Sequence, residues 1–165
     1  MSSAKISAAE VLQRLNAEHL TLCTAESCTG GLVGKLITDV PGASSVYMGG
    51  VISYTNEVKH RVLGVSRDTL AQYTAVSAET AGEMARGARR LLGADIAVSV
   101  TGLAGPDGDG TGRPVGLVYI ALDRAAGCLV QELHLAGNRA AVRGAAAQAI
   151  FALLLEALSN SEECL

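Results

Sequence analysis

Apolar positions recur along the chain with two periods, one typical of helices and one typical of strands. Spacings of three and four residues, as at Val11, Leu12 and Leu15, give a helix a single apolar face. Short apolar runs, as in 20–25, are typical of buried strands. The pattern predicts helices over about 7–18, 31–38, 56–63, 66–72, 77–92 and 139–158. It predicts strands over about 20–25, 46–54, 96–100, 115–122 and 128–135.

Polar residues mark where several of the predicted helices begin. Ser7 is a predicted N-cap, and Glu10 three residues later completes a capping box. Asn56, Ser66 and Ser77 are predicted to cap the three helices in the middle of the chain, because short polar side chains can accept a free backbone N–H of the first turn.

The order of these elements predicts the fold class. Strands alternate with helices early in the chain, and a hairpin of two strands follows late. This order favours a three-layer α/β/α sandwich with a mixed, partly parallel sheet. Gly49-Gly50 indicates a bulge or a close backbone approach in the second strand. Residues 1–165 are assigned to one domain, with 1–4 and 159–165 expected to be loose ends.

Composition and charge narrow the classes of partner. The net charge is −3 and the pI about 5.6, without the basic patch of a nucleic-acid-binding protein, so no nucleic-acid partner is expected. No segment approaches the roughly 18 unbroken apolar residues of a membrane span, and none resembles a signal peptide. We therefore expect a cytoplasmic protein with no membrane partner and with reduced thiols. The cysteines show no zinc-like spacing: Cys23, Cys28, Cys128 and Cys164.

The first candidate site is the polar turn that joins the first strand to the second helix. Ser27 lies there, followed by Gly30 and Gly31. Ligands of open α/β sheets gather at the carboxyl ends of strands, and a helix N-terminus offers free N–H groups to a developing oxyanion. Ser27 could therefore attack a carbonyl. The alternative is that Ser27 or Thr29 only caps the helix.

The second candidate site lies at 54–59, where Tyr54 ends a strand and Lys59 lies one turn into a helix. A serine hydroxyl needs a base to remove its proton. His19 and His60 are on predicted helices, and His134 is in a strand without a recognisable partner. A lysine of lowered pKa, or a Lys–Tyr pair, could serve instead. The alternative is a solvated helix lysine beside a half-buried tyrosine.

The Gly-rich loop at 101–116 is a third candidate, because successive backbone N–H groups can form an anion nest. Asp107 and Asp109 raise the possibility of Ca²⁺, although the EF-hand spacing and its closing glutamate are missing. A simple surface loop is the alternative. Arg139 opens the last helix, where the helix dipole opposes a cation, so it is a candidate phosphate ligand or an ordinary surface arginine.

Taken together, these segments resemble the CinA C-terminal domain family, whose standalone members include nicotinamide mononucleotide deamidases. The resemblance covers nearly the whole chain, in order. The matching stretches are TAESCTGGL at 24–32, VPGASSVYMGGVISYTNEVK at 40–59, AVSAETAGEMARGAR at 75–89, SVTGLAGPDGDGTGRPVGLVYIA at 99–121 and GNRAAVR at 137–143.

The resemblance implies an amidohydrolase that converts nicotinamide mononucleotide to nicotinate mononucleotide and ammonia. Ser27 would be the nucleophile, with Tyr54 and Lys59 activating it and carrying the proton. The resemblance implies a pyridine-nucleotide substrate, no cofactor, no metal, and assembly as a homodimer or larger homo-oligomer. The implied substrate-binding residues are Thr29, Gly30, Gly31, Thr101, Gly102, Gly105 and Arg139.

The chain also departs from the family pattern. Asp109 stands where the family often has glycine, Arg113 where lysine precedes Pro-Val-Gly, and Leu117 where threonine is common. A carboxylate near a phosphate pocket would repel the ligand, so Asp109 is expected to point outward. Cys28 is a rival nucleophile. A catalytically silent nucleotide-binding or regulatory module, and an amidohydrolase for another pyridine or nucleoside amide, are the alternative functions.

Overall fold

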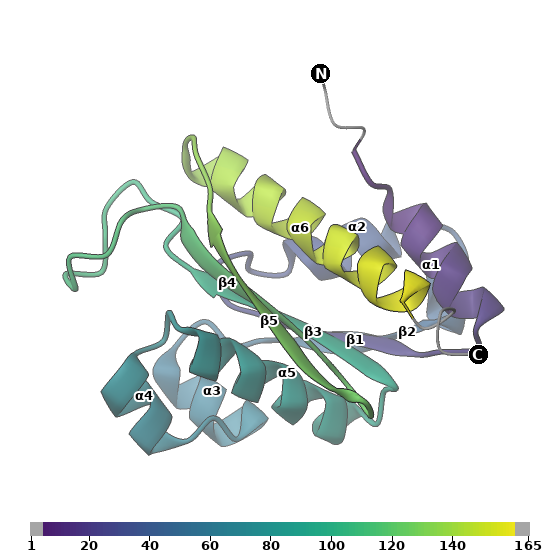
Figure 1. Cartoon of the computed structure of the whole chain (residues 1–165), viewed down its shortest axis with the longest axis horizontal. Coiled ribbons are helices and arrows are strands. Elements are labelled where there is room, and N and C mark those ends of the chain that lie inside the picture. The colour runs from purple at the N-terminus through teal and green to yellow at the C-terminus, as the bar shows by residue number, and fades with distance from the viewer. Residues whose placement is uncertain (1–4, 161–165) are drawn as a thin grey trace.

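Five strands form one mixed sheet in the computed structural model, which describes residues 5–160 (Figure 1). The strand order is β2-β1-β3-β4-β5. β2, β1 and β3 are parallel, whereas β4 and β5 run antiparallel as a hairpin. The mixed, partly parallel sheet is therefore confirmed. The bounds are β1 Leu22–Glu26, β2 Tyr47–Ile52, β3 Ile96–Gly102, β4 Leu117–Arg124 and β5 Gly127–His134.

Helices cover both faces of the sheet (Figure 1). One face carries α1 Ala8–Ala17, α2 Leu32–Thr38 and α6 Arg139–Ser159. The other carries α3 Asn56–Leu63, α4 Arg67–Tyr73 and α5 Ala78–Leu92. This arrangement confirms the three layers. A short 3-10 helix at Ala43–Ser45 was not predicted. Loose ends were predicted at 1–4 and 159–165, of which 1–4 and 161–165, with Cys164, lie outside the described residues. The prediction is wrong for Ser159, which is the last residue of α6.

The longest helix corrects the prediction that no segment approaches a membrane span. α6 is long and apolar enough to cross a membrane by length and composition. Half of its most apolar stretch is buried in the protein, where Val142, Ile150 and Leu154 belong to the core cluster shared with α1 and the sheet. This part of the helix therefore belongs to the core of the protein.

Three of the four predicted N-caps are confirmed. The hydroxyls of Ser7, Ser66 and Ser77 each accept the backbone N–H three residues on. The prediction for Asn56 is wrong, because Asn56 is the first residue of α3 and the hydroxyl of Thr55 accepts the backbone N–H of Val58. Asparagine and threonine are both common N-cap residues, so the sequence alone does not show whether Thr55 or Asn56 caps α3.

Glycines explain two features of the strands. The register of β1 and β2 shifts beside Met48, which confirms the predicted bulge, and a Cβ at Gly50 would lie 2.1 Å from Thr24 Oγ1. β4 starts at Leu117 rather than at the predicted residue 115. The reason is that Gly116 has φ +95° and lies so close to Leu135 that a Cβ would be 2.0 Å from its carbonyl oxygen.

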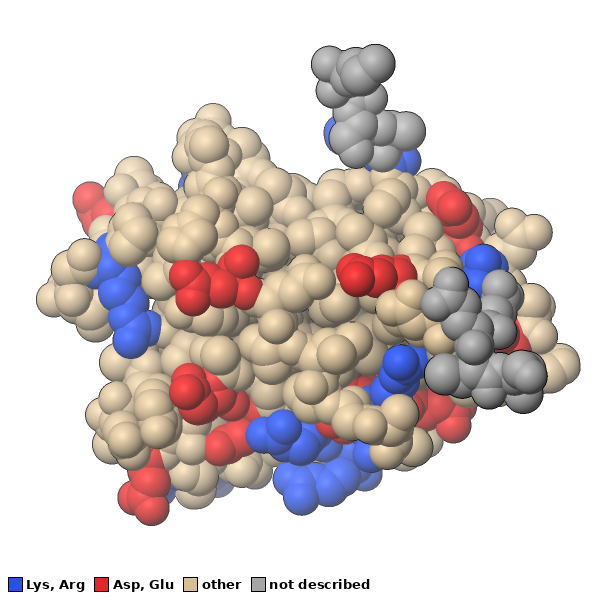
Figure 2. Space-filling view, in the orientation of Figure 1, with Lys and Arg blue, Asp and Glu red and all other residues tan. Residues whose placement is uncertain are grey.

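The charged side chains on the face shown in Figure 2 lie in scattered groups separated by uncharged surface. Some ion pairs between exposed side chains lie within one helix, as at Arg61 and Glu57 of α3, and others join two helices, as at Arg67 of α4 and Glu57 of α3. Such pairs contribute little to the free energy of unfolding. The partners expected from the overall charge remain predictions.

Candidate active site

Ser27 is placed by the centre of the sheet. It directly follows β1, the strand between β2 and β3, and its backbone N–H donates to the carbonyl of Val100 in β3 at 3.0 Å. The side chain is buried, with 8% of the residue exposed. Ser27 therefore lies at the carboxyl ends of the parallel strands, where this class of sheet binds its ligands.

Lys59 reaches Ser27 from the opposite direction. Thr55 caps α3, and Lys59 lies in the first turns of that helix with only 1% of its surface exposed. Its Nζ donates to Ser27 Oγ at 2.8 Å and to the carbonyl oxygen of Ser53 at 2.6 Å. Ser53 follows β2. The Ser27–Lys59 pair is therefore positioned by the ends of three neighbouring strands, β1, β2 and β3, and by the helix α3.

Burial changes the chemistry of Lys59. Loss of hydration lowers the pKa of its ammonium from 10.5 to about 8, while the nearby Cys28 acts weakly in the opposite sense. About a tenth of the lysine is then neutral at pH 7, against a negligible share at its ordinary pKa. A neutral Nζ has a lone pair that can accept the Ser27 proton. The alternative of a solvated Lys59 is contradicted by its burial.

Burial makes the Cys28 thiol less reactive, whereas it favours the neutral, basic form of Lys59. It is buried, and this burial raises the pKa of its thiol from 9.0 to about 11, although the charges of Lys59 and Arg143 lower it in part. Because the thiolate is the nucleophilic form of cysteine, the Cys28 thiol is poorly reactive at neutral pH. The geometry also favours Ser27, since the Lys59 ammonium is hydrogen bonded to the serine.

A cavity of about 290 Å³ opens onto this pair. Segments from both halves of the chain form its wall, including the turn before α5 and the Gly-rich loop after β3. The lining residues are Ser27, Cys28, Tyr54, Lys59, Ala75, Val76, Thr101, Gly102, Leu103, Ala104, Asp109 and Arg139. Six of the predicted site residues, from separate parts of the sequence, therefore share one cavity.

Tyr54 and Arg139 form a second pair on the same cavity. Arg139 at the start of α6 donates to the Tyr54 hydroxyl at 3.2 Å and to the carbonyl oxygen of Gly105 at 2.7 Å. Tyr54 is 60% exposed, and among the described hydrogen bonds none joins it to Ser27 or Lys59. Tyr54 therefore shares the cavity with the Ser27–Lys59 pair but is hydrogen bonded to Arg139, and Gly105 does not line the cavity.

The turn after Ser27 has a structural role that the sequence did not reveal. Its residues Thr29, Gly30 and Gly31 do not line the cavity. Gly30 and Gly31 have positive φ angles, which let the chain turn sharply into α2. The Thr29 carbonyl accepts from Arg143 at 2.8 Å. Thr29 does not cap α2, because Gly31 is the N-cap residue and makes no side-chain cap.

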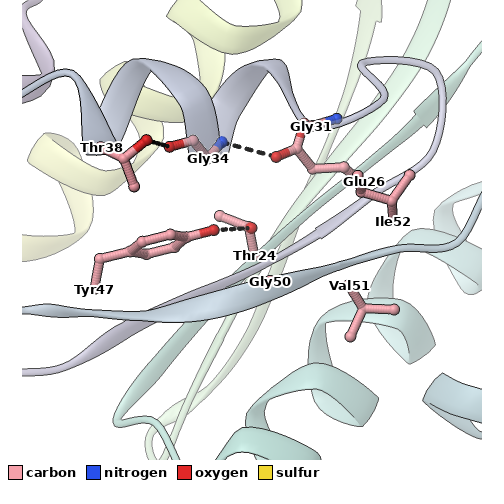
Figure 3. A pocket seen from close by; sticks show the side chains of 9 residues that line it. All are labelled: Thr24, Glu26, Gly31, Gly34, Thr38, Tyr47, Gly50, Val51 and Ile52. Carbon is pink, nitrogen blue, oxygen red and sulfur yellow. Dashed lines mark hydrogen bonds between the residues drawn. The ribbon is translucent and has the colours of Figure 1, made fainter. Parts of the chain in front are cut away.

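Glu26 replaces that missing cap. The carboxylate is buried and points from β1 toward the start of α2 (Figure 3). Its oxygens accept hydrogen bonds from four donors: Thr29 Oγ1 at 2.6 Å, Gly31 N at 3.1 Å, Val33 N at 3.0 Å and Gly34 N at 2.8 Å. A small cavity of about 190 Å³ separates this cap from β2. The negative charge complements the positive end of the helix dipole.

The Gly-rich loop is fastened to the turn before α5. The Arg113 guanidinium donates to the Thr74 hydroxyl at 3.1 Å, to the Tyr73 carbonyl at 3.3 Å and to the Val76 carbonyl. Thr101 donates to the Ala75 carbonyl at 2.7 Å. Val76 lines the cavity, so Arg113 holds part of its wall. Asp109 is exposed to solvent and also borders this cavity.

The remaining candidates for ligand chemistry are not assembled into a site. In the part of the chain that the structure describes, no group of three or more histidine, cysteine and acidic residues is placed to hold a metal ion. His134 does have a partner, contrary to the sequence interpretation, because its Nε2 lies 2.7 Å from Glu132. Asp107 and Asp109 belong to no such group either.

Fold and site define an α/β protein with a buried serine–lysine pair at the carboxyl ends of parallel strands. A family model described as "CinA C-terminal domain" matches residues 4–158, and the chain belongs to this family. A putative competence-damage inducible protein of Acetivibrio thermocellus is 54% identical over 125 residues, which are 76% of this chain. A CinA-like protein of Geobacter sulfurreducens is 54% identical over 75% of it. The chain spans about 30% of the length of these two relatives.

Solved structures of similar length agree with this assignment. A CinA superfamily protein of Klebsiella pneumoniae has a TM-score of 0.91 at 35% identity, with 93% of this chain and 96% of that chain covered. The corresponding protein of Escherichia coli has a TM-score of 0.89 at 33% identity, with 94% and 92% covered. The resemblance stated from the sequence is therefore confirmed.

Proposed function

We propose that the protein is an amidohydrolase that converts nicotinamide mononucleotide to nicotinate mononucleotide and ammonia. The observation that carries this proposal is the 2.8 Å hydrogen bond between buried Lys59 and Ser27 on a ligand-sized cavity. Membership of a family that includes such deamidases supports the substrate. Arg139 on the same cavity supplies a cation for the phosphate. We also propose a cytoplasmic location, as the sequence predicts.

Acylation of Ser27 would be the first step. Neutral Lys59 accepts the hydroxyl proton as Ser27 Oγ bonds to the carboxamide carbon, and the carbonyl electrons move onto its oxygen. Lys59 then donates this proton to the amide nitrogen. The carbon–nitrogen bond breaks, ammonia leaves, and the carbonyl of the acyl-enzyme re-forms. The Ser53 carbonyl holds Nζ in place through this exchange.

The oxyanion formed in this step needs hydrogen-bond donors. Within residues 5–160, the backbone N–H of Cys28, which lines the cavity, donates to no other residue. It lies beside Ser27 in the turn that leads to the N-terminus of α2, where the helix dipole also favours negative charge. We assign it as a donor to the oxyanion.

Deacylation would repeat the chemistry with water as the nucleophile. Lys59 takes a proton from the water, whose oxygen attacks the acyl carbon, and the bond to Ser27 Oγ breaks. Ser27 recovers its proton from Lys59, and nicotinate mononucleotide leaves. The net reaction consumes one water and one amide and yields one carboxylate and one ammonium ion, because the released ammonia takes up the proton of the acid.

Assembly of the protein remains a proposal. The edge strand β2 exposes Met48 and Ile52, and Tyr54, two residues after it, is exposed on the cavity wall. Exposed apolar edge strands are commonly covered in native proteins. This supports the homodimer or larger homo-oligomer that the family resemblance implies.

A substrate panel tests the proposed function. We expect ammonia release from nicotinamide mononucleotide to exceed that from nicotinamide riboside or nicotinamide by at least about tenfold in kcat/KM, because only the nucleotide can make a charge-assisted contact with Arg139. Enzymatic detection of ammonia and chromatography of nicotinate mononucleotide measure both products.

Two results would contradict the proposal. Binding of the nucleotide in a thermal-shift assay without ammonia release by the folded protein would indicate the silent nucleotide-binding module. Faster turnover of the riboside or of nicotinamide would indicate an amidohydrolase for a different amide.

A further inference from the structure

The wall of the cavity carries two opposite charges besides the Ser27–Lys59 pair. Arg139 opens α6, and Asp109 lies in the Gly-rich loop. Among the described residues Arg139 contacts only neutral groups, the Gly105 carbonyl and the Tyr54 hydroxyl, so its charge is not cancelled by a protein carboxylate. The cavity therefore offers one cation and one anion to a bound ligand.

The carboxylate of Asp109 is fixed in place by its own loop. Oδ1 accepts the backbone N–H of Thr111 at 3.0 Å and the Thr111 hydroxyl at 2.5 Å. These bonds hold the pKa of Asp109 below its usual value, so the group is ionised at neutral pH. No described residue donates to Oδ2, which leaves this oxygen available to a ligand.

The loop that carries Asp109 is itself anchored. Arg113 makes three hydrogen bonds to the segment 73–76 on the other side of the cavity. Thr74 in that segment has φ +71°, a strained angle for a threonine, and its carbonyl accepts from the hydroxyl of Thr80 at 2.7 Å. Contacts from several elements thus fix the wall, and the charge of Asp109 keeps a defined place on it.

We propose that Asp109 is a specificity-determining residue that favours amides attached to a cationic, N-substituted pyridinium ring over amides on an uncharged ring. This inference rests on the proposed function and names the part of the substrate that the carboxylate recognises. A pyridinium nucleotide carries a positive ring and a negative phosphate, which complement Asp109 and Arg139 respectively. A carboxylate beside a positive ring stabilises the bound state by simple Coulomb attraction, which solvent at this open wall reduces.

The variant Asp109→Asn tests the proposal, because asparagine keeps the acceptor for Thr111 and removes only the charge. We expect KM for nicotinamide mononucleotide to rise about fivefold, with little change in kcat. The inhibition constant of its dihydropyridine form, whose ring is uncharged, should stay the same. Raising the salt concentration should reduce the difference between wild type and variant. Asp107→Asn is the matched control, since Asp107 is in the same loop but not on the cavity wall.

Two outcomes would overturn the proposal: an unchanged KM in Asp109→Asn, or equal weakening of the charged and uncharged nucleotides. Failure of the proposed function would look different, since the wild type itself would release no ammonia. In that case, calorimetric titration of the wild type and of Asp109→Asn still tests the role of Asp109. The titration compares the affinity for nicotinamide mononucleotide with that for its uncharged dihydropyridine form.

Discussion

Replacing Lys59 by methionine is expected to abolish ammonia release and, at the same time, to make the protein more stable. Loss of the general base should reduce kcat by at least about 10³-fold. Methionine has a similar length and no charge to desolvate. Lowering a lysine pKa from 10.5 to about 8 costs the folded state about 3 kcal/mol at pH 7, and the variant is relieved of this cost. Urea unfolding at pH 7 measures the gain.

The same pKa shift fixes the pH dependence of stability. Between pH 8 and 10.5 the unfolded chain binds the Lys59 proton and the folded protein does not. The contribution of Lys59 to the free energy of unfolding should therefore rise with pH through this window and be constant on either side. The difference between wild type and Lys59→Met isolates this contribution from other titrating groups. Lys35→Met, which replaces an exposed lysine of α2, is the control. A Lys59→Met protein less stable than wild type at pH 7 would contradict the account.

Replacing Glu26 by glutamine is expected to lower the free energy of unfolding by about 3 kcal/mol. Glutamine has the same shape but lacks the charge, and its amide NH₂ would face donors that now bind a carboxylate oxygen. At least one buried donor then loses its acceptor, and the favourable interaction with the dipole of α2 is lost. Chemical denaturation followed by far-ultraviolet circular dichroism measures the change.

A matched carboxylate provides the control for Glu26. Glu10 lies in the first turn of α1 and is exposed, so Glu10→Gln should change the free energy of unfolding by less than about 0.5 kcal/mol. Equal effects of the two substitutions would show that the four hydrogen bonds of Glu26 do not fix the turn. We also expect a lower kcat in Glu26→Gln, because Ser27 is the next residue.

Most of the fold could be predicted from the sequence because its signals are local. The helix period around Val11, Leu12 and Leu15 and the serine caps of α1, α4 and α5 depend only on neighbouring residues. The predicted ends of the strands were less accurate, because pairing with a neighbouring strand determines where a strand ends. β3 extends to Gly102 because Gly102 pairs with Val118, a contact that no local pattern contains.

The site could be predicted only in part. Ser27 and Lys59 were candidates by residue type, but they are 32 residues apart, and only the placement of β1, β2 and α3 joins them. The acceptor for Lys59 is the backbone carbonyl of Ser53, which residue type cannot reveal. Glu26 belongs to the stretch TAESCTGGL at 24–32. Its role as a helix cap, however, depends on the turn at Gly30 and Gly31, which brings the start of α2 to its carboxylate.

Ammonia release from nicotinamide mononucleotide by Ser27→Ala and Cys28→Ala, measured beside the wild type, tests the central claim most directly. The two neighbouring residues are both buried on the same cavity, so the pair of variants controls for disturbance of the turn. We predict that Cys28→Ala retains at least about a tenth of the wild-type kcat, while Ser27→Ala loses at least about 10³-fold with its fold intact. Ammonia release that persists in folded Ser27→Ala and disappears in Cys28→Ala would contradict the account.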